Sequence, residues 1–120
     1  MSKSNELTQQ IIAFIYKSGG FAWRNNSVGI FDRSRGIYRT APKKGVSDIL
    51  ACFKGQLIAI EVKIGKDRLS PEQTGFLKSI QHAGGIAFVA TSYENFLEKL
   101  STIKPLTVLD PVDILTRVRL

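Results

Sequence analysis

Three charged residues in the middle of the chain have the types and the spacing of a metal-dependent hydrolytic site. Asp48 precedes one apolar stretch, and Glu61 and Lys63 close the next one. Both stretches are rich in β-forming residues, and they flank Lys54-Gly55, where glycine tolerates the positive φ of a tight primed turn. Residues 45–63 are therefore predicted to form a β-hairpin that carries all three charges.

The length of the turn sets the register of this predicted hairpin. Counting back from a two-residue turn at Lys54-Gly55 places Asp48 directly opposite Glu61. Directly opposed residues have Cβ atoms roughly 4.5–5.5 Å apart, so two carboxylates at these positions repel each other. A divalent cation would compensate the repulsion, and oxygen ligands suit Mg²⁺ or Mn²⁺. A β-bulge near Asp48 would shift the acids off direct opposition but leave them neighbours.

The alternation of side chains along the second strand separates the chemistry from the core. Glu61 and Lys63 are two residues apart and project from one face, whereas Ile58, Ile60 and Val62 take the other face and are expected to pack in the core. A metal ion held here would polarise a phosphoryl oxygen and lower the pKa of water. The lysine ammonium would orient the nucleophile or offset the charge that develops at the phosphate.

Four segments that include this hairpin follow one another along the chain. They are Gly45-Val46-Ser47-Asp48-Ile49, Ile60-Glu61-Val62-Lys63, Leu69-Ser70-Pro71-Glu72-Gln73, and Gly84-Gly85 before an apolar strand. In this order they resemble the VRR-Nuc (virus-type replication-repair nuclease) family of the PD-(D/E)XK nuclease superfamily. Serine replaces the superfamily's proline before the acid, as is common in that family. The resemblance covers about residues 5 to 95, and the series in order is more specific than D…ExK by itself.

The resemblance implies both a fold and an activity. The fold is an α/β restriction-endonuclease-like fold of the PD-(D/E)XK type, with a mixed central β-sheet flanked by helices. The activity is that of a metal-dependent DNA endonuclease, which would hydrolyse phosphodiester bonds in branched DNA such as flaps or four-way junctions. Small stand-alone members of the family form homodimers, so the resemblance also implies a homodimer. It further implies a phage or mobile-element setting.

The resemblance also implies which residues form the active site. The implied catalytic residues are Asp48, Glu61, Lys63, Gln73 and Glu6. Asp48, Glu61 and the Val62 backbone carbonyl would hold Mg²⁺ or Mn²⁺. Lys63 would position or activate the attacking water.

Glu6 and Gln73 each have a structural explanation beside the functional one. Glu6 is the only acid on the first predicted helix and would complete the metal site directly or through water, but an acid is also favourable at a helix N-terminus. Gln73 would orient the water or a ligand. It would equally form half of a capping box with Ser70, and the two roles can coexist.

The net charge of +7 comes entirely from the half of the chain that contains this site. Eleven Lys and Arg residues stand against four Asp and Glu residues between Lys17 and Arg68, whereas the remainder has six of each. A basic surface favours nucleic acid, although solubility is a plain alternative. The residues expected to contact phosphates are Arg24, Arg33, Arg35, Arg39, Lys43, Lys44, Lys66 and Arg68. Because no pattern here reads base edges, we expect binding directed by backbone and shape.

The remaining elements are predicted from hydrophobic periodicity and capping residues. They are a helix over 5–18 capped by Ser4 or Asn5, an edge strand or irregular ribbon over 21–31, a basic loop over 32–44 with Gly36-Ile37-Tyr38 as a short strand, a helix from Ser70 to Gly84-Gly85, a strand over 86–91, a helix over 93–100, a strand over 106–109 and a helix over 112–118. This order predicts an α/β sandwich with a mixed sheet.

Two side chains carry an expectation about burial. Trp23 is expected in the core, and the alternative is a platform on which a base stacks. Cys52 is the only cysteine, which excludes an internal disulfide and a cysteine-based zinc site, and it is expected to be a buried thiol.

Length and composition bound the remaining expectations. The 120 residues predict one domain, with a core over about 5–100 and an apolar C-terminal extension over 101–120 that completes the core or covers a partner subunit. No apolar run approaches the roughly 18 residues of a membrane span, and the N-terminus lacks a hydrophobic signal region. We therefore expect a cytoplasmic protein, in a bacterial or phage-infected host cell.

Two other functions remain open at this point. The first is a non-catalytic basic DNA-binding module, although such a module has no reason to oppose Asp48 and Glu61, because paired acids repel phosphate when no metal is bound. The second is a fold in which the hairpin acids form only structural ion pairs, for example between Asp48 and Lys63.

Overall fold

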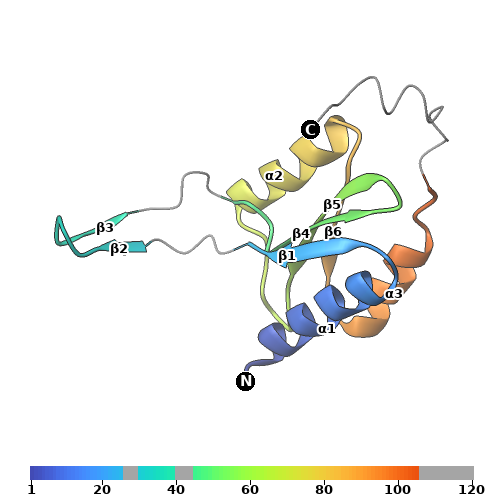
Figure 1. Ribbon diagram of the computed structural model, residues 1–120, viewed down its shortest axis with the longest axis horizontal. Helices are drawn as coiled ribbons and strands as arrows, with labels where there is room; N and C mark the ends of the chain where they lie inside the picture. Colours follow the sequence, from blue (N-terminus) through green and yellow to red (C-terminus); the bar gives the residue numbers. More distant parts are fainter. Residues whose placement is uncertain (26–29, 40–44, 106–120) are drawn as a thin grey trace.

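A four-stranded mixed sheet forms the centre of the molecule (Figure 1). The computed structural model describes residues 1–25, 30–39 and 45–105. The strands lie in the order β1 (Phe21–Arg24), β4 (Ile49–Phe53), β5 (Gln56–Val62) and β6 (Ile86–Ala90). The first three run antiparallel to their neighbours, and β6 runs parallel to β5. The mixed sheet confirms the predicted fold class.

Helices cover both faces of this sheet. Helices α1 (Lys3–Lys17) and α3 (Tyr93–Ser101) pack on one face, and α2 (Pro71–His82) packs on the other (Figure 1). Because β6 is parallel to β5, the chain needs a crossover between them, and α2 supplies it. None of these helices is both long and apolar enough to cross a membrane.

The alternation along β5 divides the apolar interior into two cores. Ile58, Ile60 and Val62 join the larger core between the sheet and the α1–α3 layer, and the first two are completely buried. Ala59 points the other way, into a smaller core with Leu77 of α2. The predicted assignment of Ile58, Ile60 and Val62 to a core face is therefore confirmed.

The central hairpin has the predicted turn and register. Lys54 and Gly55 have φ values of 53° and 79°, as a primed two-residue turn requires at both central positions. Ile49 pairs with Ile60 across the two strands. This is the last pair of the ladder: Asp48 is the residue before β4 and Glu61 is the next residue of β5, so the acids lie at this end of the hairpin, and their direct opposition stays a prediction.

Capping residues set the helix ends, with one correction to the predictions. The side chain of Ser2 accepts a hydrogen bond from the backbone N–H of Asn5, so α1 begins at Lys3, before the predicted caps Ser4 and Asn5. Ser2, Ser4 and Asn5 all suit an N-cap, and capping by Ser2 makes the helix longer than capping by either of the other two. The helix ends at Lys17, one residue before the predicted end, and the predicted stop signal Gly19-Gly20 follows its C-cap Ser18, with the Gly20 N–H donating to the Ile15 carbonyl over 2.8 Å.

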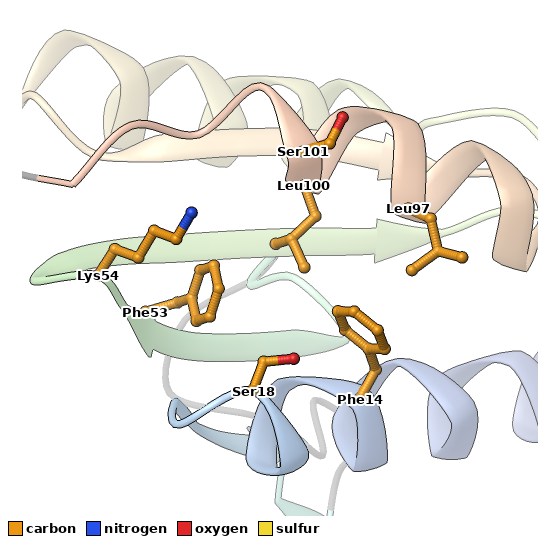
Figure 2. A pocket seen from close by; sticks show the side chains of 7 residues that line it. All are labelled: Phe14, Ser18, Phe53, Lys54, Leu97, Leu100 and Ser101. Atoms are coloured by element: carbon orange, nitrogen blue, oxygen red, sulfur yellow. The ribbon is translucent and has the colours of Figure 1, made fainter.

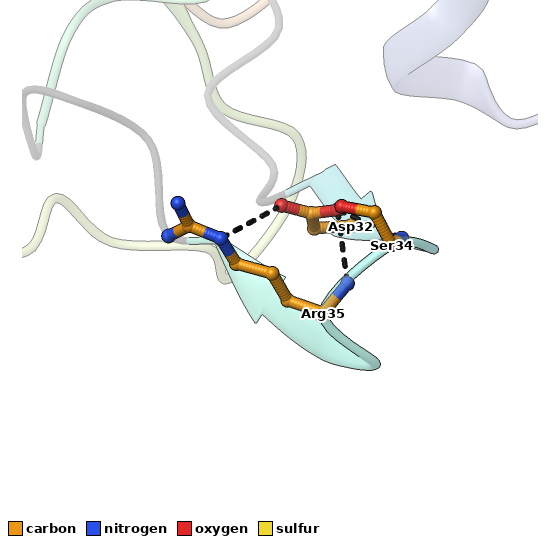
Figure 3. Close-up of polar contacts among 3 residues, drawn as sticks. All are labelled: Asp32, Ser34 and Arg35. Atoms are coloured by element: carbon orange, nitrogen blue, oxygen red, sulfur yellow. Dashed lines mark hydrogen bonds and ion pairs between the residues drawn. The ribbon is translucent and has the colours of Figure 1, made fainter.

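A second antiparallel hairpin lies apart from the main sheet (Figure 1). Strands β2 (Ile30–Asp32) and β3 (Ile37–Arg39) pair with each other and with no other element of the described chain. Asp32 belongs to β2 and so departs from the loop predicted over 32–44, residues 33–36 form a turn within that loop, and the short strand predicted at Gly36-Ile37-Tyr38 is confirmed as β3. The Asp32 carboxylate closes the turn by accepting hydrogen bonds from the backbone N–H groups of Ser34 and Arg35 and from the Ser34 hydroxyl (Figure 3).

Two side chains are more exposed than the sequence predicts. Trp23 is 42% exposed because β1 is an edge strand and α2 packs only on β5 and β6. Cys52 is exposed because it alternates with Ala51 and Phe53, which face the larger core. The strand and helix predicted over 106–109 and 112–118 lie outside the described residues.

Candidate active site

Hydrogen bonds hold the two hairpin acids together at one end of the sheet. The Asp48 Oδ2 atom accepts from the backbone N–H of Val62 over 2.8 Å, which ties its side chain to the strand that carries Glu61. The Asp48 carbonyl accepts from the Asn25 N–H over 2.8 Å, continuing the β1–β4 pairing. Asp48 is therefore fixed by the strands on both sides of it.

Glu61 is a buried carboxylate with one oxygen unused. The residue is 1% exposed, and its Oε1 atom accepts from Gln73 Nε2 over 3.0 Å. Its Oε2 atom is buried and has no hydrogen-bond partner in the described part of the chain. Burial, and then the neighbouring Asp48 carboxyl, raise the pKa of Glu61 to about 8, while the Lys63 ammonium opposes this rise. A buried anion beside a second acid is unfavourable unless a cation or a proton neutralises it.

These donors fit a divalent cation. Two carboxylates with an unused buried oxygen are hard ligands of the kind that Mg²⁺ and Mn²⁺ take. Ser47, beside Asp48 in the chain, is also fully buried, and its hydroxyl lacks a partner among the residues described. The functional prediction did not single out Ser47, and nothing in the sequence marked its hydroxyl as buried.

Gln73 forms the predicted capping box and also contacts Glu61. Its Oε1 atom accepts from the Ser70 N–H over 2.9 Å, and the Ser70 Oγ atom accepts from the Gln73 N–H over 3.1 Å, which completes the capping box of α2. Because the oxygen of the amide is committed to the cap, its nitrogen points at Glu61. The start of α2 thereby orients one side of the acid pair.

Gly45 brings the segment before Asp48 against the same helix start. Its φ of +81° lies in the left-handed region, and a Cβ placed there would overlap the backbone carbonyl of Glu72 and come 2.9 Å from the Gln73 nitrogen. Only glycine allows this approach. The sequence showed Gly45 as part of a motif, but the steric reason for it is a tertiary contact.

Lys63 continues β5 beyond its last assigned residue. Its backbone N–H donates to the Ala90 carbonyl over 3.1 Å, which holds the lysine beside the acids. Its charge lowers the pKa of Glu61, as expected of an ammonium on that face. An Asp48–Lys63 ion pair, the alternative considered above, is not observed. The ion pair found within the described ranges joins Arg35 to Asp32.

Within the described residues, Glu6 does not form a three-residue cluster with Asp48 and Glu61. It is exposed in the first turn of α1, next to Asn5, whose Oδ1 atom accepts from the Arg24 guanidinium. In residues 1–25, 30–39 and 45–105, no three His, Cys, Asp or Glu side chains lie close enough to hold a metal together. The structure thus joins Asp48 to Glu61, whereas a role for Glu6 stays a prediction.

The predicted phosphate contacts fall into separate regions. Arg33 and Arg35 are exposed at the turn of the β2–β3 hairpin, where Arg35 Nε lies 3.9 Å from Asp32 Oδ2 (Figure 3). Hydrogen bonds from Ser34 lower the pKa of Asp32. The other positions are Arg39 in β3, Arg24 at the end of β1, exposed Lys66 and Arg68 between β5 and α2, and Lys43 and Lys44 outside the described residues.

An apolar cavity lies on the other side of the sheet from the acids. It has a volume of about 330 Å³ between α1, α3 and the end of β4, and Phe14, Phe53, Leu97 and Leu100 line most of it (Figure 2). These side chains belong to the α1–α3 layer or pack against it, whereas Glu61 contacts α2. The cavity is therefore separate from the acid pair.

Comparisons with known proteins agree with this architecture. The model of the VRR-NUC domain family matches residues 33–94, just over half of the chain. No curated protein matches the sequence. Among solved structures, Hjc, a Holliday junction resolvase from the archaeal hyperthermophile Archaeoglobus fulgidus, is 24% identical, with a TM-score of 0.52 over 73% of this chain and 67% of that chain. This likeness shows the fold, which is the predicted restriction-endonuclease-like fold.

Proposed function

Because the chain belongs to the VRR-NUC family of nucleases, we propose that it is a divalent-metal-dependent DNA endonuclease that hydrolyses phosphodiester bonds in branched DNA. One observation carries the proposal: Glu61 is buried beside Asp48 with an oxygen that has no partner within the part of the chain described. A binding module gains nothing from a buried acid pair, whereas a metal-dependent hydrolase requires one.

Asp48, Glu61 and the Val62 carbonyl would hold Mg²⁺ or Mn²⁺, and Glu6 would contribute through water, because it does not join the two acids directly. When bound, the metal supplies Lewis-acid polarisation of the scissile phosphate and lowers the pKa of water. The raised pKa of Glu61 supports this assignment. It shows that a negative charge on this buried carboxyl beside Asp48 is unfavourable without a partner, and a bound cation would neutralise that charge.

The other site residues act on the nucleophile and on the phosphate. Gln73 donates a hydrogen bond to the Oε1 atom of Glu61. The Oε2 atom of Glu61, which has no partner among the described residues, would then bind a ligand. The Lys63 ammonium lies close enough to lower the pKa of Glu61 and would position the attacking water or offset charge at the phosphate. Gln73 would also orient the water.

Charge and fold likeness support the choice of substrate. Arginines on a hairpin apart from the sheet would contact phosphates away from the cleaved bond, which suits DNA that extends in more than one direction. Hjc, which shares the fold, is a Holliday junction resolvase. We propose four-way junctions or flaps as substrates, and a homodimer that places two sites on two strands in the cytoplasm of a bacterial or phage-infected cell.

A cleavage assay tests this function. Labelled four-way junction, flap and linear duplex DNA are incubated with the protein in Mg²⁺, Mn²⁺ or EDTA, beside Lys63→Ala. Lys78→Ala, which removes an exposed lysine of α2 outside the site, is the matched control. We expect cleavage that requires metal, favours branched DNA, is lost in Lys63→Ala and is kept in Lys78→Ala.

Other outcomes would contradict the proposal in different ways. Salt-sensitive binding without cleavage of any substrate would indicate a basic DNA-binding module. Equal cleavage of linear and branched DNA would keep the nuclease and remove its selectivity for structure. Protein that neither binds nor cleaves DNA would remove both.

A further inference from the structure

Two aromatic side chains are exposed side by side on the edge strand β1. Trp23 is 42% exposed and Phe21 is 57% exposed, and their ring centroids are 5.8 Å apart with a tilt of 54°. Tyr16 of α1 packs edge-on against Phe21, with a centroid distance of 5.7 Å. Phe21 therefore contacts two rings and Trp23 one, while much of the Trp23 and Phe21 surface faces solvent.

The strand register places these rings on the same face of the sheet as the acids. Trp23 pairs with Leu50, which in turn pairs with Ala59 on β5. Ala59 and Glu61 are two residues apart, so they project from one face, and Ala22, which points the other way, is 2% exposed. Trp23 thus belongs to the cross-strand row next to Asp48 and Glu61, and Phe21 to the row after it.

The rings remain exposed because α2 covers only part of this face. The helix α2 packs on β5 and β6, where Gln73 contacts Glu61. In the described residues it makes no contact with β1. Two large rings are costly to expose to water unless a ligand covers them. Arg24, the next residue after Trp23, is exposed, but alternation along β1 and its hydrogen bond to Asn5 of α1 turn its side chain to the other side of the strand, so it adds positive charge to this edge of the sheet without lying beside the rings.

We propose that Trp23 and Phe21 form a stacking platform for a base of the substrate that loses its stacking neighbour at the branch point, next to the bond that is cleaved. This inference rests on the proposed nuclease function and deepens it. Aromatic side chains bind single-stranded bases through their π-faces, without regard to sequence. The platform would favour a branch point over the interior of a linear duplex, because bases at a branch point can lose a stacking neighbour and bases inside a duplex keep both.

Trp23 is the only tryptophan of the chain, so its fluorescence reports on the platform directly. Protein carrying Lys63→Ala is titrated in EDTA with a flap, a four-way junction or a linear duplex, while anisotropy of the labelled DNA records binding. We expect strong quenching of Trp23 by branched DNA at saturation and little by the duplex. Equal quenching by both, or saturated binding of branched DNA without quenching, would overturn the inference.

Substitutions separate stacking from other apolar contacts. Trp23→Ala should weaken binding of branched DNA by about 10-fold and leave duplex binding unchanged, while Trp23→Phe should restore most of the loss. Leu57→Ala is the control, because Leu57 is 44% exposed on the same face but has no ring. A further outcome concerns the protein without DNA. If Trp23 emission then changes with protein concentration, and Leu57→Ala reduces that change, the face binds a second copy of the chain and the platform is refuted.

The two proposals fail separately in these experiments. Quenching by branched DNA together with no cleavage by the unsubstituted protein would keep the platform and remove the nuclease. Metal-dependent cleavage that Trp23→Ala leaves unchanged, together with unquenched fluorescence, would keep the nuclease and remove the platform.

Discussion

The acid pair and the β2–β3 hairpin are built in opposite ways. Glu61 is almost completely buried, and contacts from β4 and α2 hold it and its neighbour Asp48 in place. The hairpin is closed by a local hydrogen-bonded turn at Asp32 and packs on no other element that the structure describes. The residues proposed for catalysis therefore lie where tertiary contacts are dense, and those proposed for phosphate binding on the hairpin lie where contacts are local.

This difference matches what each task requires. A reacting phosphate must meet its ligands within a fraction of an ångström, which only a packed site achieves. Phosphates recur along the whole DNA backbone, so a basic hairpin needs charge and reach more than an exact position. Substitutions should accordingly affect cleavage, stability and binding in a manner that depends on the region.

The largest effect is expected from Asp48→Asn. Loss of one charged ligand should lower the cleavage rate by on the order of 10³-fold, because the metal supplies several kcal/mol of transition-state stabilisation. Binding to branched DNA in EDTA should be unchanged or tighter, since a negative charge is removed. Single-turnover cleavage and anisotropy measure the two quantities, and a parallel loss of binding would contradict a purely catalytic role.

The next effect concerns pH and Glu61. Its pKa is about 8 in the folded protein against an ordinary 4.5, so between these values the folded state holds a proton that the unfolded state has lost. The free energy of unfolding should therefore fall as pH rises from 4.5 to 8. Urea unfolding at several pH values measures this slope. Glu61→Gln should remove its contribution, and Mg²⁺ should stabilise the protein more at pH 8 than at pH 5; an unaltered slope in Glu61→Gln would refute the assignment.

Gly45→Ala should disturb the acid pair through α2. The left-handed φ costs about 1 kcal/mol for alanine, and overlap with the Glu72 carbonyl adds about 1–3 kcal/mol. Gly84→Ala is a matched control, because Gly84 also has a positive φ, +95°, but no atom within 4 Å of the added Cβ. Urea unfolding should show a clearly greater loss for Gly45→Ala, and equal losses would mean that the contact with α2 does not matter.

The smallest effect on the fold is expected from the hairpin. Arg33→Ala with Arg35→Ala should change the free energy of unfolding by less than about 1 kcal/mol, because the pair between Arg35 and Asp32 is on the surface. DNA binding should weaken for linear and branched DNA alike, with the salt dependence reduced by about one unit for each lost phosphate contact. Anisotropy at several salt concentrations measures this, and an unchanged salt dependence would remove the hairpin from the DNA interface.

Much of the site's framework could be predicted because local signals specify it. The turn at Lys54-Gly55 determined the register, and alternation from Ile58 to Val62 determined which face is core. Ser70, Pro71 and Gln73 marked the start of α2 within four residues. The neighbourhood of Asp48 and Glu61 followed from these signals, whereas the catalytic roles of the site residues remain predictions.

The sequence by itself thus determined the central hairpin, the starts of α2 and α3 and the meeting of the two acids, because each depends on residues a few positions apart or on one strand pair. Only the tertiary structure decided that Trp23 and Cys52 are exposed, that Gly45 meets α2, and that one oxygen of Glu61 has no hydrogen-bond partner among the described residues. The physical reason is that burial depends on which element covers each part of the sheet. That coverage is a balance over contacts between distant segments, and no local pattern records it.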